Sequence, residues 1–184
     1  MIVPSGNEGK PAMLISKKMN EAINRQICNE FSAMVQYVAI ASHFVEESLH
    51  ELAAHFYRQA DEERDHAMRF VKYVLDAGGH VELNDIPSPQ HRFKTVEEAI
   101  RLSLDQEKKV TEQINQLVEL AIKERDHITQ NALSWFVNEQ LEEVSSMDSL
   151  LKMVQRAGPT NLLYVEDFVS RHKGKSRVPM AGTS

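Results

Sequence analysis

A glutamate and a histidine stand three residues apart near the middle of a long helix-forming stretch. On a helix, Glu63 and His66 would lie side by side on one face. Phe56 and Phe70, seven residues before and after Glu63, predict that this face is apolar. Such a pair is more often part of a solvated helix face. On an apolar face, however, its two side chains converge within one turn and suit a metal ion.

Other helix-forming stretches repeat this pattern of a polar residue between apolar residues at i−7 and i+7. The residues are Glu30, Glu107, Gln140 and Glu143. Buried carboxylates are costly when unpaired, and several facing one another would have to protonate or bind cations. No Lys or Arg lies on the same stripes, so a divalent metal is the expected partner.

The donor types narrow the choice of metal. Carboxylate oxygens dominate, with one imidazole nitrogen and no sulfur, which favours iron or manganese over copper or structural zinc. Two metal ions fit if Glu30 and His66 bind one, Glu107 binds the other and Glu63 bridges them. Gln140 would be a weak ligand or a hydrogen-bond partner.

The elements that must position these side chains are helices. The chain has 184 residues, 42% of them hydrophobic, with few Gly and Pro, which is typical of an all-α domain with a real core. Helix start and stop signals predict a flexible arm at 1–15, a helical domain at 16–172 and a disordered tail at 173–184. Within the domain we expect four long helices at 16–44, 48–77, 95–123 and 126–157 and a short fifth at 161–172, with caps at Ser16, Ser48, Thr95 and Asp126.

The segment 78–94 is long for a loop and has no helical period. A helix of ~28 residues is about 42 Å long, and an extended segment of this size can span it. We therefore expect a long crossover that lets the second and third helices run parallel.

Charge and composition exclude several classes of function. The formal net charge is −6, which gives the whole molecule no bias toward nucleic acid or anionic membranes. Cys28 is the only cysteine, which excludes an intrachain disulfide and a cysteine-based zinc site and fits a reducing compartment. No signal peptide or membrane-spanning run is visible, so we expect a cytoplasmic protein.

The motifs together resemble a known family. NEF-x(5)-Y at 29–37, EERDH at 62–66, LDQE at 104–107 and NEQLEE at 138–143 are similar to the non-haem bacterial ferritins, in particular those of the actinobacterial, mycobacterial type. The resemblance runs from about residue 16 to 172. It implies a ferritin-like four-helix bundle with a long crossover and a short fifth helix.

The resemblance also implies roles for individual residues. It places Glu30, Glu63 and His66 at a first iron and Glu63 and Glu107 at a second, with Gln140 close by. It further implies a third iron site, drawn from Glu62, Glu139, Glu142 and Glu143. Tyr37 is either a partner of the site's carboxylates or an ordinary core tyrosine.

Two departures from related proteins matter. The stretch Gln140-Leu141-Glu142-Glu143 lacks the second E-x-x-H of bacterioferritin and most di-iron proteins, so the second iron should be held more weakly. Arg64 occupies the position of the haem-binding methionine of bacterioferritin, so no haem is expected.

The implied function is oxidation of Fe(II) by O2 or H2O2 and storage of ferric mineral inside a homo-oligomeric shell of 24 subunits. Alternatives are another di-iron oxidase or peroxidase of the rubrerythrin kind, a catalytically inactive subunit, and a DNA-protecting shell. A rubrerythrin would need four cysteines or a second E-x-x-H, and the acidic charge disfavours DNA binding, although the tail at 171–177 is basic. We interpret Trp135 as a core residue rather than an electron relay, and Cys28 as a small buried residue.

Overall fold

The computed structural model describes residues 13–172, so the predicted tail and most of the predicted arm lie outside the described residues. Four long helices and one short helix account for the described chain, with no strand between residues 13 and 172. They are α1 Lys17–Glu46, α2 His50–Asp76, α3 Val96–Glu124, α4 His127–Ala157 and α5 Leu162–Arg171. The predicted all-α bundle is confirmed.

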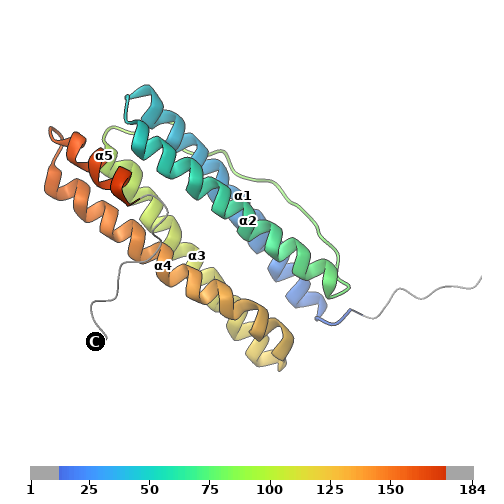
Figure 1. Ribbon diagram of the computed structural model, residues 1–184. Coiled ribbons are helices and arrows are strands. Elements are labelled where there is room, and N and C mark those ends of the chain that lie inside the picture. The colour runs from blue at the N-terminus through green and yellow to red at the C-terminus, as the bar shows by residue number, and fades with distance from the viewer. Residues whose placement is uncertain (1–12, 173–184) are drawn as a thin grey trace, which may run out of the picture.

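The helices form two antiparallel pairs, α1 with α2 and α3 with α4, packed into one bundle (Figure 1). The segment between α2 and α3 returns along the outside of the α1–α2 pair, so α2 and α3 run parallel as expected. The short helix α5 packs against α2 and α4 at one end of the bundle. None of the helices within 13–172 combines the length and apolar character needed to cross a bilayer.

Three of the four predicted caps are present. Ser16 accepts a hydrogen bond from the Met19 amide at 3.0 Å, Thr95 accepts one from Glu98 and Asp126 accepts one from Thr129. These side chains satisfy backbone N–H groups that a helix start leaves unpaired.

The cap predicted at Ser48 is wrong. Ser48 has a positive φ of 60° and precedes the N-cap residue Leu49, which makes no side-chain cap. The carboxylate of Glu166 in α5 accepts hydrogen bonds from the amides of Glu51 and Leu52 at 2.9 and 2.8 Å instead. The helix α5, distant in the sequence, therefore caps α2. The same hydrogen bonds attach α5 to the bundle.

A row of polar side chains on α1 holds the crossover in place. Asn24 donates to the carbonyl of His80 and accepts from the amide of Glu82, both at 2.8 Å. At one end of the row, Asn20 donates to the carbonyl of His80 and accepts from its amide. At the other end, Gln36 donates to the carbonyl of Gln90 and accepts from its amide. Four residues of a helix rise about 6 Å, and two residues of an extended segment span about 6.6 Å. Every fourth residue of α1 can therefore meet every second residue of the crossover.

Cys28 belongs to the same row and is only partly buried. Its sulfur accepts a hydrogen bond from the Asn84 amide at 3.3 Å. The interpretation of Cys28 as a small buried residue was therefore wrong. Along α1, Ile23, Ile27 and Ala41 are fully buried, whereas Val38 is exposed in the isolated chain.

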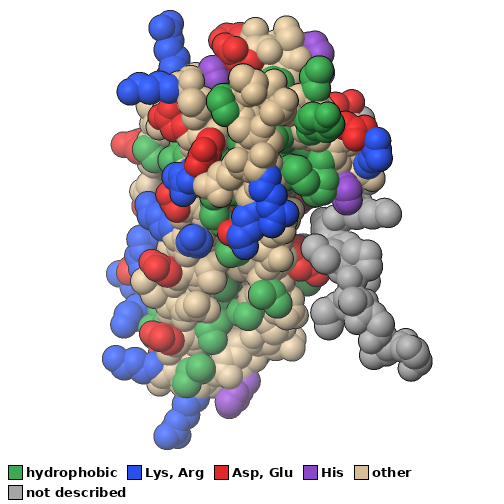
Figure 2. All heavy atoms as spheres, turned by 90° about the vertical axis from the view of Figure 1, so that its left-hand side faces the viewer, with side chains coloured by type: hydrophobic (Ala, Val, Ile, Leu, Met, Phe, Trp, Pro, Cys, Tyr) green, Lys and Arg blue, Asp and Glu red, His purple; other side chains and the backbone are tan. Residues whose placement is uncertain are grey.

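The apolar interior is divided into two clusters along the bundle. One includes Tyr37, Phe44, Phe56 and Met147, and the other includes Ile27, Phe70, Ile114 and Leu133. Polar residues from all four long helices occupy the layer between them. On the outside, the face in Figure 2 shows acidic and basic side chains interspersed, with exposed hydrophobic side chains among them.

Candidate metal centre

The layer between the two apolar clusters contains four buried acids. Glu30, Glu63 and Glu107 are each 1% exposed, and Glu143 is 8% exposed. They come from α1, α2, α3 and α4 in that order, and each lies near the middle of its helix. The apolar residues at i−7 and i+7 pack into the flanking clusters, which is why these positions face inward.

Two of these acids meet the only imidazole of the layer. One ligand atom from each of Glu30, Glu63 and His66 can be chosen so that all lie within 4.8 Å of one another. The Oε2 atoms of Glu30 and Glu63 are buried and have no hydrogen-bond partner. Buried polar atoms without partners are costly, so this geometry suits a cation.

Glu107 is held beside this group by neighbouring side chains. The hydroxyl of Tyr37 donates a hydrogen bond to its Oε1 atom, and the Gln140 amide donates to its Oε2 atom at 3.3 Å. Gln140 also donates to the Glu107 backbone carbonyl at 3.1 Å. Tyr37 is completely buried, so it is both a core tyrosine and a partner of a carboxylate.

Crowding of acids raises the pKa values in the layer. Burial, followed by the charge of Glu63, raises the pKa of Glu30 well above its usual range. Burial, followed by Glu107, does the same to the pKa of Glu63. Burial and the charges of Glu107 and Glu62 raise the pKa of Glu143 to about 8. The metal-free layer therefore favours protonated acids, and a divalent cation would take the place of those protons.

A second group of candidate ligands shares His66. Ligand atoms of His66, Glu139 and Glu143 also lie within 4.8 Å of one another. Of the other residues expected at a third site, Glu62 is exposed and Glu142 is half-buried, and neither joins this group. The structure thus brings together part of the predicted third site.

Two glutamines of the layer were missed from the sequence. Gln26 donates to Glu30 Oε1 at 2.9 Å, and Gln59 donates to Glu62 and, at 3.3 Å, to Glu143. Both are buried. Each stands four residues before a candidate ligand, Glu30 or Glu63, so a search for polar residues at i−4 would have found them.

Aromatic rings close the layer on the α4 side. The His66 ring meets Trp135 edge to face with centroids 5.4 Å apart, and it meets Phe136 in the same way at 6.2 Å. These contacts orient the imidazole and limit the access of water. Trp135 is partly buried, and its role as a core residue rather than an electron relay stays a prediction.

Comparisons with known proteins agree on one family. A family model described as a ferritin-like domain matches residues 20–157. Ferritin BfrB of Mycolicibacterium smegmatis is 45% identical over 157 residues, covering 85% of this chain and 86% of the relative. A bacterial non-heme ferritin of Staphylococcus haemolyticus is 34% identical over 161 residues, covering 86% and 97%. An open-pore ferritin of the archaeon Archaeoglobus fulgidus superimposes with a TM-score of 0.84 at 33% identity, covering 86% of this chain and 98% of that one.

Proposed function

Because the chain belongs to the ferritin family, we propose that it stores iron and oxidises Fe(II) to Fe(III) with O2 at a site inside each subunit. One observation carries the proposal for the site. The oxygens of Glu30 and Glu63 that accept no hydrogen bond converge beside His66, in a layer with no Lys or Arg among its buried residues within 13–172. Such a layer suits a divalent cation that prefers oxygen and imidazole donors.

We assign the ligands as follows. Glu30 and His66 bind a first Fe(II), Glu107 binds a second, and Glu63 bridges the two. Gln140 and Tyr37 hold the Glu107 carboxylate in one orientation through their hydrogen bonds. Two Fe(II) ions each give one electron to O2, which takes up two protons and leaves as hydrogen peroxide.

A third iron position is part of the proposal. The group formed by His66, Glu139 and Glu143 supports it, and Gln59 links Glu143 to Glu62 at its edge. Because the group shares His66 with the first position, ferric product could leave the site in this direction. Glu142 is not among the ligands that we assign to this third iron.

We further propose that the subunits assemble into a hollow shell of 24 copies in which the ferric mineral collects. Closed symmetric assembly is the usual outcome for homo-oligomers. The apolar side chains that α5 leaves exposed support assembly, because Leu163 and Tyr164 are 83% and 71% exposed in the isolated chain. Contacts between copies would cover them.

Stopped-flow mixing of the metal-free protein with about two Fe(II) per subunit in air tests the oxidation. We expect a fast phase of Fe(III) formation well above the rate of buffer alone. A Glu63→Ala variant should assemble normally and lose the fast phase, because both irons lose their shared ligand. An exposed acid on α3 provides the matched control, and Glu119→Ala should oxidise iron as the wild type does.

Either of two results would refute the assignment. Oxidation at the buffer rate by the wild-type protein would leave only a storage shell. A fast phase that survives Glu63→Ala in an intact assembly would place the reaction elsewhere.

A further inference from the structure

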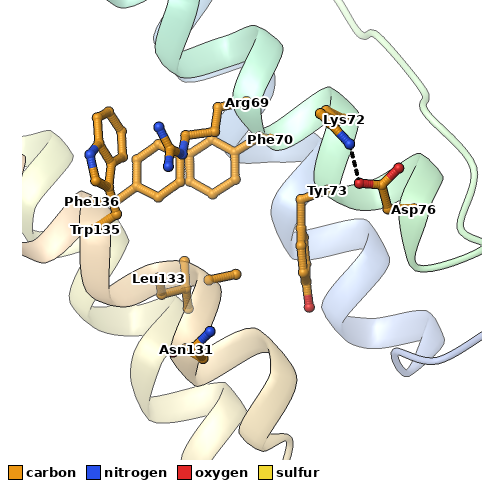
Figure 3. A pocket seen from close by; sticks show the side chains of 10 residues that line it. Arg69, Phe70, Lys72, Tyr73, Asp76, Asn131, Leu133, Trp135 and Phe136 are labelled. Atoms are coloured by element: carbon orange, nitrogen blue, oxygen red, sulfur yellow. Dashed lines mark hydrogen bonds and ion pairs between the residues drawn. The ribbon is translucent and has the colours of Figure 1, made fainter.

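A pocket that the proposed iron site does not use opens between α2 and α4. Its volume is about 300 Å³, and Figure 3 shows Arg69 and Tyr73 of α2 on one side and Asn131 and Trp135 of α4 on the other. The side chains that line it include one guanidinium group, one amide and several aromatic rings. Aromatic rings beside a few polar and charged groups are a lining that can hold and orient a small molecule.

Arg69 is the cation available to a ligand. Its guanidinium group lies over the Trp135 ring, 3.9 Å from the ring centroid, and it makes no ion pair with an acid anywhere in residues 13–172. Lys72, the other cation of the pocket, is already paired with Asp76 at 2.5 Å. Stacking on an indole fixes the plane of a guanidinium group and leaves its N–H edge free for an oxyanion.

The rest of the wall suits a flat ring. Phe70 and Phe136 are buried and stack in parallel with centroids 3.8 Å apart. Tyr73 stands at the side of the pocket, and its hydroxyl already forms a hydrogen bond with the Thr129 hydroxyl at 2.6 Å. Tyr73 and Trp135 are the partly exposed rings of this wall, so an aromatic ligand would cover them, whereas free phosphate would leave them in water.

We propose that the pocket between α2 and α4 binds a small aromatic carboxylate, with the carboxylate on Arg69 and the ring against the aromatic wall. A guanidinium group matches a carboxylate with two parallel hydrogen bonds, and the Asn131 amide offers a further polar contact. The inference goes beyond the proposed function and does not depend on iron. It is nevertheless placed to influence the metal layer, since Trp135 also contacts His66.

The pocket carries its own reporter, because Trp135 is the only tryptophan of the chain. We would titrate the assembled, metal-free, full-length protein with benzoate and follow tryptophan fluorescence, with calorimetry as an independent measure of affinity. Three comparators each lack part of benzoate. Acetate lacks the ring, benzyl alcohol lacks the charge, and inorganic phosphate lacks both the ring and the carboxylate geometry. We expect saturable binding of benzoate and much weaker binding of all three comparators.

Two variants locate the binding. Arg69→Gln should weaken benzoate affinity by about tenfold or more, because a charged hydrogen-bonded pair is lost. Lys108→Gln removes a cation from the exposed face of α3, outside the pocket, and should bind benzoate as the wild type does.

Several outcomes would overturn the inference. They are the absence of saturable benzoate binding to the assembled protein, equal affinity in Arg69→Gln, and phosphate binding as tight as benzoate binding, which would indicate a general anion site. Iron oxidation is measured separately. A protein that oxidises iron and ignores benzoate would retract only this inference.

Discussion

At the scale of single residues, the four acids buried in one layer are costly to the folded state unless protons or cations neutralise their charges. A carboxylate with a raised pKa keeps its proton in the folded protein and gives it up in the unfolded chain, where its pKa is ordinary. The folded state is then favoured at low pH, and that advantage is lost as the pH rises through the folded pKa. A bound divalent cation would reverse this cost.

Glu143 offers a direct test of this argument. Because its folded pKa is about 8 and its unfolded pKa is near the ordinary 4.5, its contribution to the free energy of unfolding should fall between these pH values and level off above them. Glu143→Gln should remove that fall. The free energy of unfolding of the variant should therefore rise relative to that of the wild type by up to about 1.4 kcal/mol per pH unit across this window. Denaturant unfolding of metal-free protein at several pH values measures the difference. The exposed Glu119→Gln should follow the wild-type curve, and a constant gap between Glu143→Gln and wild type would contradict the argument.

Tyr37 tests how the Glu107 carboxylate is held. Tyr37→Phe keeps the buried ring and removes only the hydroxyl that donates to Glu107. Loss of a hydrogen bond that orients a metal ligand typically weakens metal binding by about tenfold or more. Anaerobic titration with Co(II), a redox-stable substitute for Fe(II), should show this loss, whereas Tyr164→Phe removes an exposed hydroxyl and should not. Unchanged affinity in Tyr37→Phe would mean that Glu107 does not depend on this contact.

The helices differ in how far their own sequence determines where they begin. Ser16, Thr95 and Asp126 cap their helices through local contacts, and a capping pattern identifies them. The start of α2 depends on Glu166, which is 115 residues from Glu51. No local pattern encodes that contact, so the capping box predicted at Ser48 failed.

Removal of the Glu166 carboxylate should loosen both helices that it joins. In Glu166→Ala the amides of Glu51 and Leu52 lose their acceptor, at a cost of about 1 kcal/mol, which is typical of a lost helix cap. Hydrogen exchange followed by mass spectrometry should show faster exchange in the first turn of α2 and in α5. Asp167→Ala breaks only an exposed pair with Arg171 on the same helix and should leave α2 protected. Equal protection of α2 in Glu166→Ala would show that the cap is dispensable.

The inward position of the acids was predictable for a physical reason. Residues seven apart lie on one helix face, so apolar neighbours at both i−7 and i+7 place Glu30, Glu63 and Glu107 in the interior. The contacts of Gln26 and Gln59 were not predicted, because an amide four residues from an acid is common on solvated helix faces too. Which carboxylate oxygens lack partners depends on packing between helices that lie far apart in the sequence.

At the scale of the whole molecule, the exposed apolar residues of α5 lead to a prediction about assembly. Leu163 contributes almost nothing to the buried core of the subunit, so Leu163→Arg should leave the subunit folded. If contacts between copies cover this surface, as we propose, a charge there should favour smaller oligomers. Native mass spectrometry should show this shift, with circular dichroism confirming unchanged helix content. A full shell formed by Leu163→Arg would exclude this residue from the contacts between copies.

The central claim is that acids from separate helices meet around a shared pair of cations. Crystals of the protein soaked anaerobically in Fe(II), with diffraction recorded on both sides of the iron absorption edge, test this claim most directly. We predict two anomalous peaks in the layer bounded by Glu30, Glu63, His66 and Glu107 of each subunit, apart from any third peak at His66, Glu139 and Glu143. Iron found only on the subunit surface, with this layer empty at saturating Fe(II), would contradict it.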